Sequence, residues 1–515
     1  MCCTIALRQW PRATSRSDSP YLSLSQRRIP ALAGEEALFF LSCPRHFDWG
    51  GRGVTASVSQ DVLYRDEVLT VEPHGLERIQ EAERHGTLAG QFNVWFAANM
   101  HLTTLVLGAL GVTLGLGFWA TALSCAFGNL LGALGNSLCV AMGPRLGMPQ
   151  LPMSRSAFGF RGNYVPAFLA WLGYIGWVTV DNTLGAQTSQ QLFGTPYVPT
   201  TLALGIATIV ITIYGYNLVH AWERWLTRAS LVVFAFLTVA ALFLGAGPAT
   251  APTKSGAAFW AAFLLEFTIM FSYTVSWAPY AADYARYLPS DTSLRGPFWY
   301  SFWGMFLSTT WTNVLGALLG TLAVTGGVIP AMRTVAGAGT AAIYAILVLG
   351  SISSNTLNMY SGGMGGLTWG LPLRRTGATL LVGILGVALS TAFGGPRFIK
   401  FFEGFLFMLV YWVTPWIAII GIDFYLFYRR GLAYPDPREF YRPDGLFGSV
   451  HWTGLAAFAI GIAASVPFMA TDWYTGPIGK AIGGADLSYV VSFVVAGAIY
   501  LVAGRPVAST VAAPA

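Results

Sequence analysis

The stretch Ser351-Ile352-Ser353-Ser354-Asn355-Thr356-Leu357-Asn358 lies near the middle of an otherwise apolar run from about Ala341 to Met364. That run is long enough to cross a bilayer. A hydroxyl or amide group in hydrocarbon costs several kcal/mol unless it has a hydrogen-bond partner. Polar groups at this depth therefore face protein or a water-filled cavity, and they often mark a pathway. The stretch predicts a membrane protein with a polar site near the midplane of the bilayer.

The composition of the whole chain indicates an all-α integral membrane protein. Of the 515 residues, 54% are hydrophobic and 10% are charged, and the mean hydropathy is +0.56, whereas soluble proteins carry about 25% charged residues. The apolar runs are long, unlike the ~10-residue alternating segments of a β-barrel. The net charge of +6 does not indicate nucleic-acid binding, because the arginines fall in short loops and near the amino terminus. The five cysteines form no CxxC or Cys/His cluster, so neither a disulfide framework nor a metal site is indicated.

We expect a transporter domain over residues 87–505, a cytosolic and largely disordered tail over 1–86, and a short tail over 506–515. Because no methionine occurs between Met1 and Met100, we hypothesise that part of 1–53 is translated upstream sequence and that the native start is Val54. The apolar runs predict twelve membrane spans, numbered here in chain order: 93–117, 119–142, 164–192, 199–216, 225–246, 257–280, 297–326, 338–364, 377–395, 401–428, 453–470 and 485–504.

Loop arginines predict how these spans are oriented. Loops on the side of the amino terminus carry thirteen arginines, whereas the loops on the other side carry five lysines and arginines. Cytosolic loops are enriched in these residues. We therefore expect a multi-pass protein of the cell membrane with both termini in the cytoplasm.

Spans 1 and 6 both contain a signal for an interrupted helix. Span 1 includes Asn99 and His101, which are costly in lipid, and span 6 includes Pro279, which removes a backbone donor. Paired interruptions at corresponding positions are typical of transporters built from inverted repeats, in which unwound backbone binds ions and substrate. The alternative is an ordinary packing helix kinked by proline.

Span 3 carries Trp177 and Asp181, which share a helix face because they are four residues apart. An aromatic plane beside a hydrogen-bond acceptor suits a flat ligand that donates hydrogen bonds. The alternative for Asp181 is a structural acid bonded to a tyrosine or a serine. Glu266 in span 6 is a weaker candidate, because the face that it occupies is not evident.

In span 8, Asn355 and Asn358 lie three residues apart, and each amide offers a donor and an acceptor that can read the edge of a heterocycle. Ser353 and Ser354 add hydroxyl oxygens that suit a small cation. The alternative is hydrogen bonding between helices, worth about 0.6 kcal/mol per bond in membranes. The chain contains no HExxH, Walker or GxSxG motif. We therefore expect neither an enzyme nor a bound cofactor.

The chain from about Arg84 to Arg505 resembles the nucleobase:cation symporter-1 family, and most closely its purine–cytosine permease branch. The matching segments are Trp95-Phe96-Ala97-Ala98-Asn99-Met100, Gly143-Pro144-Arg145-Leu146-Gly147 with Ser154-Arg155-x-x-Phe158-Gly159, Gly176-Trp177 with Gly185-Ala186-Gln187, Tyr280-Ala281-Ala282-Asp283-Tyr284, and Ser354-Asn355-x-x-Asn358-x-Tyr360-Ser361. Each segment alone is weak, but five in order across twelve spans are specific to the family.

The resemblance implies the leucine-transporter fold, with two inverted five-helix repeats (spans 1–5 and 6–10) and discontinuous spans 1 and 6. It implies a planar base bound between spans 1, 3, 6 and 8, stacked on Trp177, with Asp181 and Asn355 near its polar edge. It also assigns Ser276 and Asn358 to substrate contacts. A coupling cation would lie between spans 1 and 8, held by the following groups: the carbonyls of Ala97, Met100 and Gly350 and the hydroxyls of Ser353 and Ser354.

One position departs from the family pattern, because relatives usually carry an amide where this chain has Asp181. A carboxylate there accepts hydrogen bonds from a base, or it is the site of a coupling proton. This position therefore leaves open which base is bound and whether the coupling ion is H⁺ or Na⁺.

From these features we predict a secondary active transporter that imports a nucleobase, either cytosine or a purine, by symport with a cation. Its partners would be this small molecule and the lipid bilayer, and the oligomeric state stays open. The alternatives are an allantoin-, hydantoin- or thiamine-type transporter of the same family, a membrane receptor with this fold that does not transport, and a passive channel.

Overall fold

The computed structural model describes residues 68–243, 251–322, 327–394, 398–471 and 474–506. The expectations for residues 1–67, including the start at Val54, and for the end of the chain from 507 lie outside these residues. The described residues form helices and no β-strand, with one isolated bridge between Ala470 and Thr475.

The helices of the first half follow the expected spans 1 to 5. Their bounds are η2 Glu81–Glu83, α1 Leu88–Ala97, α2 Leu102–Thr113, α3 Gly117–Val140, α4 Gly143–Leu146, α5 Gln150–Met153, α6 Arg155–Phe158, α7 Tyr164–Phe193, α8 Tyr197–Tyr214 and α9 Tyr216–Phe243. α1 begins where the Thr87 hydroxyl accepts the Gly90 amide at 3.0 Å. α7 ends at Gly194, whose φ of +69° continues the chain in a left-handed turn.

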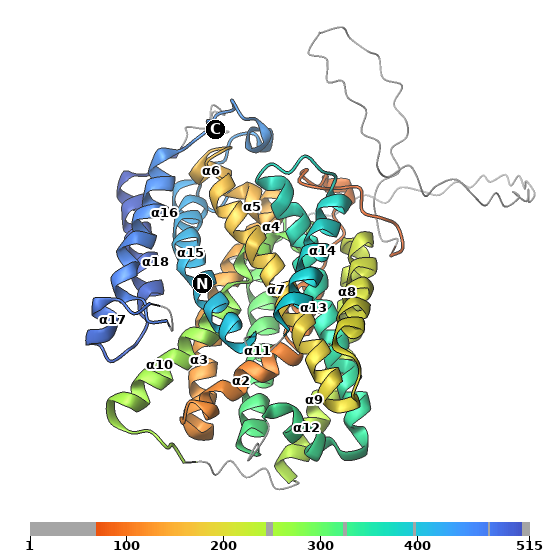
Figure 1. Cartoon of the computed structure of the whole chain (residues 1–515). Helices are drawn as coiled ribbons and strands as arrows, with labels where there is room; N and C mark the ends of the chain where they lie inside the picture. Colours follow the sequence, from red (N-terminus) through yellow and green to blue (C-terminus); the bar gives the residue numbers. More distant parts are fainter. Residues whose placement is uncertain (1–67, 244–250, 323–326, 395–397, 472–473, 507–515) are drawn as a thin grey trace, which may run out of the picture. The chain divides into compact units, whose positions relative to one another are not determined.

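The helices of the second half follow the expected spans 6 to 12. Their bounds are α10 Gly256–Val275, η3 Ala278–Asp283, α11 Arg295–Leu322, α12 Val328–Ala336, η4 Gly337–Gly339, α13 Thr340–Thr368, α14 Arg375–Phe393, α15 Phe398–Gly421, η5 Ile422–Phe427, η6 Pro437–Tyr441, α16 Trp452–Ser465, η7 Val466–Phe468, α17 Pro477–Ala481 and α18 Ser488–Ala503. In Figure 1, α4, α5 and α6 lie at one end of the helices and α12 at the other, while α16 and α18 pack on each other and on α15.

Within the described part of the chain, seven helices are long and apolar enough to cross a membrane, and the number is eight if the bent pair α1 and α2 is counted as one span. α16 with η7, and α18, are shorter apolar helices. Each of the twelve expected ranges contains a helix, but the count of twelve membrane spans stays a prediction.

Helices from the first half of the chain pack on helices from the second half in matching pairs. α3 of span 2 packs on α10 of span 6, and α11 of span 7 packs on α1 and α2 of span 1. α7 and α13, of spans 3 and 8, pack on each other, and so do α8 and α14, of spans 4 and 9. A two-fold axis that relates spans 1–5 to spans 6–10 would produce these pairs, so the packing agrees with the expected inverted repeat.

α2 and α11 cross where each contributes a glycine. A Cβ atom on Gly108 would lie 2.0 Å from the carbonyl oxygen of Asn313, and one on Gly316 would lie 2.0 Å from the carbonyl oxygen of Leu105. Only glycine therefore lets these two backbones approach so closely.

Gly108→Ala is expected to lower the free energy of unfolding by about 1–3 kcal/mol, because the added methyl group overpacks this crossing. Thermal unfolding of the purified protein in detergent measures the change. Gly421→Ala is the matched control, since a Cβ atom on that helical glycine meets nothing within 4 Å. Equal unfolding midpoints for the two variants would contradict the close approach.

Candidate functional site

Span 1 is broken at the position that the sequence predicts. α1 ends at Ala97, α2 begins at Leu102, and the two helices are bent by 57°. The Asn99 side-chain amide donates to the Trp95 carbonyl at 2.7 Å, and the Met100 amide donates to the Ala97 carbonyl at 3.1 Å. The Ala97 carbonyl therefore already accepts one hydrogen bond within the turn.

Span 6 changes its helix type at the predicted proline. α10 ends at Val275, and the chain continues after Trp277 as the 3₁₀ helix η3, with Pro279 in its first turn. The hydroxyl of Ser276 donates to the carbonyl of Tyr273 at 2.7 Å, within its own helix. Ser276 is buried at the junction, but in this structure its hydroxyl bonds to backbone.

Asp181 of α7 is fully buried against the beginning of α2. Its Oδ1 accepts a hydrogen bond from the Thr103 hydroxyl at 2.5 Å and lies 3.7 Å from Nδ1 of His101. Its Oδ2 has no hydrogen-bond partner among the described residues. The hydroxyl of Ser354 on α13 is a further neighbour of this carboxylate. Asp181 thus joins spans 1, 3 and 8 and retains one free acceptor.

Trp177 lies one turn before Asp181 on α7 and is surrounded by aromatic rings. The indole centroid is 5.5 Å from that of Tyr273, 5.2 Å from that of Phe405 and 6.1 Å from that of Phe402. All three rings are nearly perpendicular to the indole, at 78–81°. These three neighbours therefore contact the indole in edge geometry, and none of them stacks on it in parallel.

The two asparagines of span 8 form a chain of hydrogen bonds between helices. The Tyr280 hydroxyl of η3 donates to Oδ1 of Asn358 at 2.8 Å, and Nδ2 of Asn358 donates to Oδ1 of Asn355 at 3.2 Å. Nδ2 of Asn355 then donates to the Val178 carbonyl of α7 at 3.4 Å. The structure brings spans 3, 6 and 8 together here, with both amides bonded to protein.

The predicted cation ligands lie on the α13 face that packs on the break of span 1. A Cβ atom on Gly350 would lie 2.6 Å from the Met100 carbonyl oxygen, so that carbonyl approaches α13 closely. The Ser353 hydroxyl, however, donates to the Glu223 carboxylate of α9. The sequence interpretation did not single out Glu223, because the expected span 5 begins at residue 225 and leaves Glu223 in the preceding loop beside Arg224; the structure makes it the eighth residue of α9.

A second residue missing from the sequence interpretation is Tyr273 of α10. Its hydroxyl contacts three groups of span 1: Oδ1 of Asn99 at 2.8 Å, the Thr104 hydroxyl at 2.8 Å and Nε2 of His101 at 3.2 Å. A tyrosine in an apolar span has no distinguishing pattern, because its role depends on which helix lies opposite.

Glu266, the weaker candidate of span 6, lies apart from these groups. Its Oε1 accepts from the Cys125 thiol of α3 at 3.4 Å. It is buried where α10 packs on α3, and among the described residues its carboxylate makes no hydrogen bond or ion pair with the groups around Asp181.

The family model described as "Permease for cytosine/purines, uracil, thiamine, allantoin" matches residues 78–492. The chain belongs to this family. The permease is therefore a multi-pass membrane transporter and not an enzyme, as the resemblance implied.

The putative purine-cytosine permease YxlA of Bacillus subtilis is 33% identical over 454 residues, which cover 85% of this chain and 97% of that protein. The purine-cytosine permease fcyB of Emericella nidulans is 27% identical and covers 84% of this chain and 88% of that protein.

Among solved structures, the permease is similar to Mhp1, a nucleobase-cation-symport-1 family transporter in a closed conformation with bromovinylhydantoin bound. The TM-score is 0.67 at 17% identity, and the match covers 83% of this chain and 94% of that chain. At this identity the likeness concerns the fold, and it confirms the predicted leucine-transporter-type fold class. The exact span count and the repeat are not tested by it.

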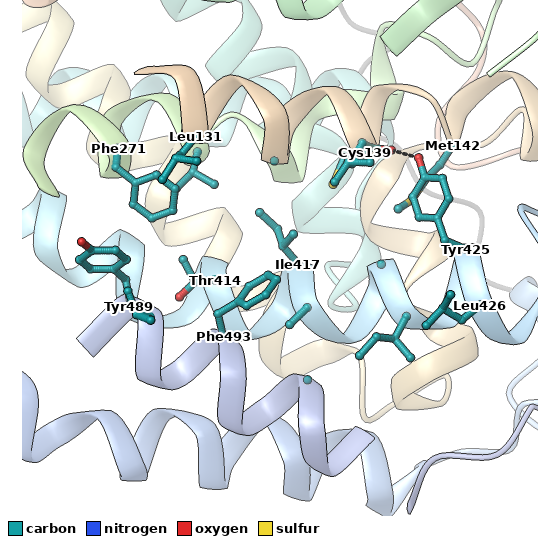
Figure 2. A pocket seen from close by; sticks show the side chains of 18 residues that line it. Leu131, Cys139, Met142, Phe271, Thr414, Ile417, Tyr425, Leu426, Tyr489 and Phe493 are labelled. Atoms are coloured by element: carbon teal, nitrogen blue, oxygen red, sulfur yellow. Dashed lines mark hydrogen bonds between the residues drawn. The ribbon is translucent and has the colours of Figure 1, made fainter. Parts of the chain in front are cut away.

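An apolar pocket of about 540 Å³ lies between α3, α10, α15 and α18 (Figure 2). Leu131, Phe271, Ile417 and Phe493 are typical of its lining, and no predicted site residue contributes to it. The Tyr425 hydroxyl at its edge already donates to the Leu138 carbonyl at 2.7 Å. The pocket therefore offers few polar groups to a hydrogen-bonding ligand.

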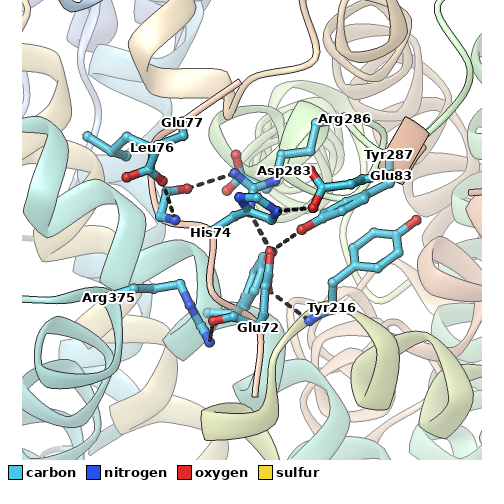
Figure 3. Close-up of polar contacts among 12 residues, drawn as sticks. Glu72, His74, Leu76, Glu77, Glu83, Tyr216, Asp283, Arg286, Tyr287 and Arg375 are labelled. Atoms are coloured by element: carbon cyan, nitrogen blue, oxygen red, sulfur yellow. Dashed lines mark hydrogen bonds and ion pairs between the residues drawn. The ribbon is translucent and has the colours of Figure 1, made fainter. Parts of the chain in front are cut away.

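A buried ionic cluster ties the segment before α1 to the permease helices (Figure 3). The carboxylate of Glu72 forms a 2.7 Å ion pair with Arg286 and accepts hydrogen bonds from the Tyr287 hydroxyl at 2.6 Å and the Tyr216 amide at 3.0 Å. Arg375 at the start of α14 donates to the Glu72 carbonyl at 3.0 Å. The segment before α1 thus packs against the starts of α9 and α14 and against Arg286 and Tyr287, which follow η3.

Proposed function

We propose that the permease imports a nucleobase, cytosine or a purine, by alternating access coupled to a proton or sodium gradient. The observation that carries this proposal is the enclosed polar site at the broken part of span 1. There the indole of Trp177 and the free Oδ2 of Asp181 lie one helical turn apart, near a chain of two amides. A flat ring with N–H donors and carbonyl acceptors complements such a site.

The proposed site consists of Trp177, Asp181, Ser276, Asn355 and Asn358. All five side chains are at least nine-tenths buried. In this closed arrangement a base would have to displace internal hydrogen bonds, such as that between Asn358 and Asn355. Opening towards one side of the membrane and then the other would expose these groups in turn, as in rocking transporters.

The coupling ion is proposed to bind beside the break, near the carbonyls of Ala97, Met100 and Gly350 and the hydroxyls of Ser353 and Ser354. The arginine-rich loops support a cell-membrane orientation with both termini in the cytoplasm.

Uptake by the purified protein in sodium-free and sodium-containing proteoliposomes tests this function. We expect accumulation of labelled cytosine or hypoxanthine above equilibrium, and competition by the unlabelled preferred base. Equilibration without accumulation would indicate a channel, and saturable binding without uptake would indicate a receptor. Unlabelled allantoin, thiamine and uracil belong in the same panel, because the family description includes these heterocycles.

Asp181→Asn is expected to weaken the apparent affinity for the base about ten-fold or more, because a hydrogen bond to a charged acceptor contributes about 1.5–3 kcal/mol. An amide keeps one acceptor oxygen and replaces the other with a donor, so it cannot accept from both Thr103 and the base. The KM of uptake, recorded across pH, measures the change. A wild-type KM in this variant would remove Asp181 from the base site.

A further inference from the structure

The apolar pocket between α3, α10, α15 and α18 is a groove on the lipid-facing surface of the permease. Several of its lining side chains are about half exposed, namely Leu131, Val490 and Phe493 at 46% and Leu426 at 58%. In a membrane transporter such apolar side chains meet hydrocarbon and not water. None of the lining residues belongs to the proposed base site, so the groove has no part in the function proposed above.

The groove extends over about one leaflet of the bilayer. Along α3 its lining runs from Leu131 to Met142, about 16 Å at 1.5 Å per residue, and half of the hydrocarbon core is about 15 Å thick. Figure 2 shows Leu131, Phe271 and Tyr489 towards one end of the groove, and Met142 and Tyr425 at the other. With its volume of about 540 Å³, the groove suits an acyl chain that lies parallel to the helices.

Arginines gather at the end of the groove that Met142 and Tyr425 mark. The exposed guanidinium of Arg430 interacts electrostatically with the Tyr425 hydroxyl. On the opposite wall, Arg145 follows Met142, and a Cβ atom on Gly431 would lie 3.2 Å from the Cβ atom of Arg145. None of the ion pairs found among the described residues includes either arginine. This end of the groove therefore carries positive charge that no carboxylate neutralises.

The acidic residue of η5 faces away from the groove. The Asp423 carboxylate accepts hydrogen bonds from the hydroxyls of Ser156 at 2.5 Å, Tyr434 at 3.0 Å and Tyr500 at 2.7 Å. Among the described residues that line the groove, none is charged. An anion beside the arginines would thus meet no carboxylate of the groove.

A phospholipid with an anionic headgroup complements both features of the groove. Its acyl chain matches the apolar lining over one leaflet, and its headgroup matches a basic site at the end of membrane helices. A second copy of the chain fits less well. In a two-fold contact the same surface is used by both copies, so the hollow would face itself and leave a void where protein interfaces are close-packed.

We propose that this groove binds one phospholipid of the cytoplasmic leaflet that carries an anionic headgroup. The acyl chain lies between α3, α10, α15 and α18, and the headgroup lies at Arg430 and Arg145. Val275, the last residue of α10, lines the groove, so the chain packs against the junction of span 6. This inference goes beyond the proposed transport function and does not depend on which base is carried.

Native mass spectrometry of the purified permease with phosphatidylglycerol, or with phosphatidylcholine of the same acyl chains, tests the headgroup. An arginine near an anionic lipid changes affinity about five-fold, so two arginines should favour phosphatidylglycerol about thirty-fold. Arg430→Gln is expected to weaken phosphatidylglycerol binding about five-fold and to leave phosphatidylcholine binding unchanged. Arg333→Gln is the matched control, because it removes an exposed arginine of α12, at the other end of the helices (Figure 1). Equal wild-type affinity for the two lipids would overturn the proposal.

Gly421→Trp tests the groove itself. Gly421 lines the groove, and a Cβ atom there meets nothing within 4 Å, so the indole takes the space of the acyl chain without displacing protein atoms. The affinity for phosphatidylglycerol should fall by about ten-fold or more, since the loss of two buried methylene groups already corresponds to that change. Gly377→Trp in α14 is the matched control, because it lies outside the groove and a Cβ atom there meets only Leu373, at 3.9 Å. Wild-type affinity in Gly421→Trp would show that the lipid binds elsewhere and would overturn the proposal.

A measurement on the wild type alone serves even where Gly421→Trp fails to fold. Phosphatidylglycerol with a photoreactive diazirine on its acyl chain should form adducts in peptides that contain residues 414–426 and 489–497. Excess unlabelled phosphatidylglycerol should remove these adducts, and phosphatidylcholine should not. Adducts spread equally over other lipid-facing helices, such as α8 and α14, would contradict a specific site. A protein dimer without bound lipid, which Gly421→Trp dissociates, would assign the groove to a second copy and would also overturn the proposal.

Discussion

Glu72→Ala is expected to lower the free energy of unfolding by about 3–5 kcal/mol, because it leaves Arg286 buried without its counter-charge. Both side chains of this pair are fully buried, with Arg286 Nη2 and Glu72 Oε1 2.7 Å apart. The substitution also removes the acceptor for the Tyr287 hydroxyl. Denaturation of the detergent-solubilised protein, followed by tryptophan fluorescence, measures the loss.

Asp444→Ala is the matched control, because this acidic side chain is exposed. Its loss is expected to change the unfolding free energy by no more than about 0.5 kcal/mol. In the double variant of Glu72 and Arg286, both to alanine, the buried charge is absent, so its destabilisation should be smaller than the sum of the two single effects. Equal losses for Glu72→Ala and Asp444→Ala would contradict the buried ion pair.

The contribution of Glu72 should also depend on pH in a defined direction. Burial opposes ionisation, but Arg286 and Arg375, with the hydrogen bonds from Tyr287 and Tyr216, hold the pKa of Glu72 below its ordinary value of 4.5. A lowered pKa means that the folded state binds this proton less readily than the unfolded state. The stability difference between the wild type and Glu72→Ala should therefore be constant above about pH 4.5 and shrink as the pH falls further.

The sequence predicts the local features of the site well, because they depend on neighbouring residues in the same span. Asn99 and His101 mark the break of span 1, Pro279 marks the change of helix type in span 6, and the four-residue spacing of Trp177 and Asp181 places them on one face. Each of these features follows from backbone chemistry or from helical periodicity.

The partners of these residues depend on contacts between distant parts of the chain, which periodicity does not determine. The spacing of Gly350 and Ser353 indicates a shared face, but it does not say that Glu223 of α9 covers that face. Likewise, Glu72 lies in a segment expected to be a disordered tail, and its ion partner Arg286 is more than two hundred residues away. Such pairs can be recognised only when the helices have been placed.

Trp177→Ala is expected to weaken saturable binding of the base by roughly five- to 150-fold. Stacking of a base on an aromatic side chain contributes about 1–3 kcal/mol by alanine substitution, which corresponds to a change in affinity of that size. The three rings around the indole meet it in edge geometry, so the loss of Trp177 also removes the ring that Tyr273, Phe402 and Phe405 contact. Equilibrium binding of labelled base to the purified protein measures the effect.

A smaller side chain at a buried tryptophan also destabilises the fold, by about 3–5 kcal/mol for tryptophan to alanine, so a control must separate folding from binding. Trp171 is suitable, because it lies on the same helix, is buried, and packs against Trp369 with ring centroids 5.5 Å apart, away from Asp181. Trp171→Ala should lower the melting temperature comparably and leave the affinity of the folded fraction near that of the wild type.

Trp177→Phe retains an aromatic face and should recover part of the binding that Trp177→Ala loses. If Trp177→Ala binds the base with wild-type affinity while it remains folded, the base does not stack on this indole.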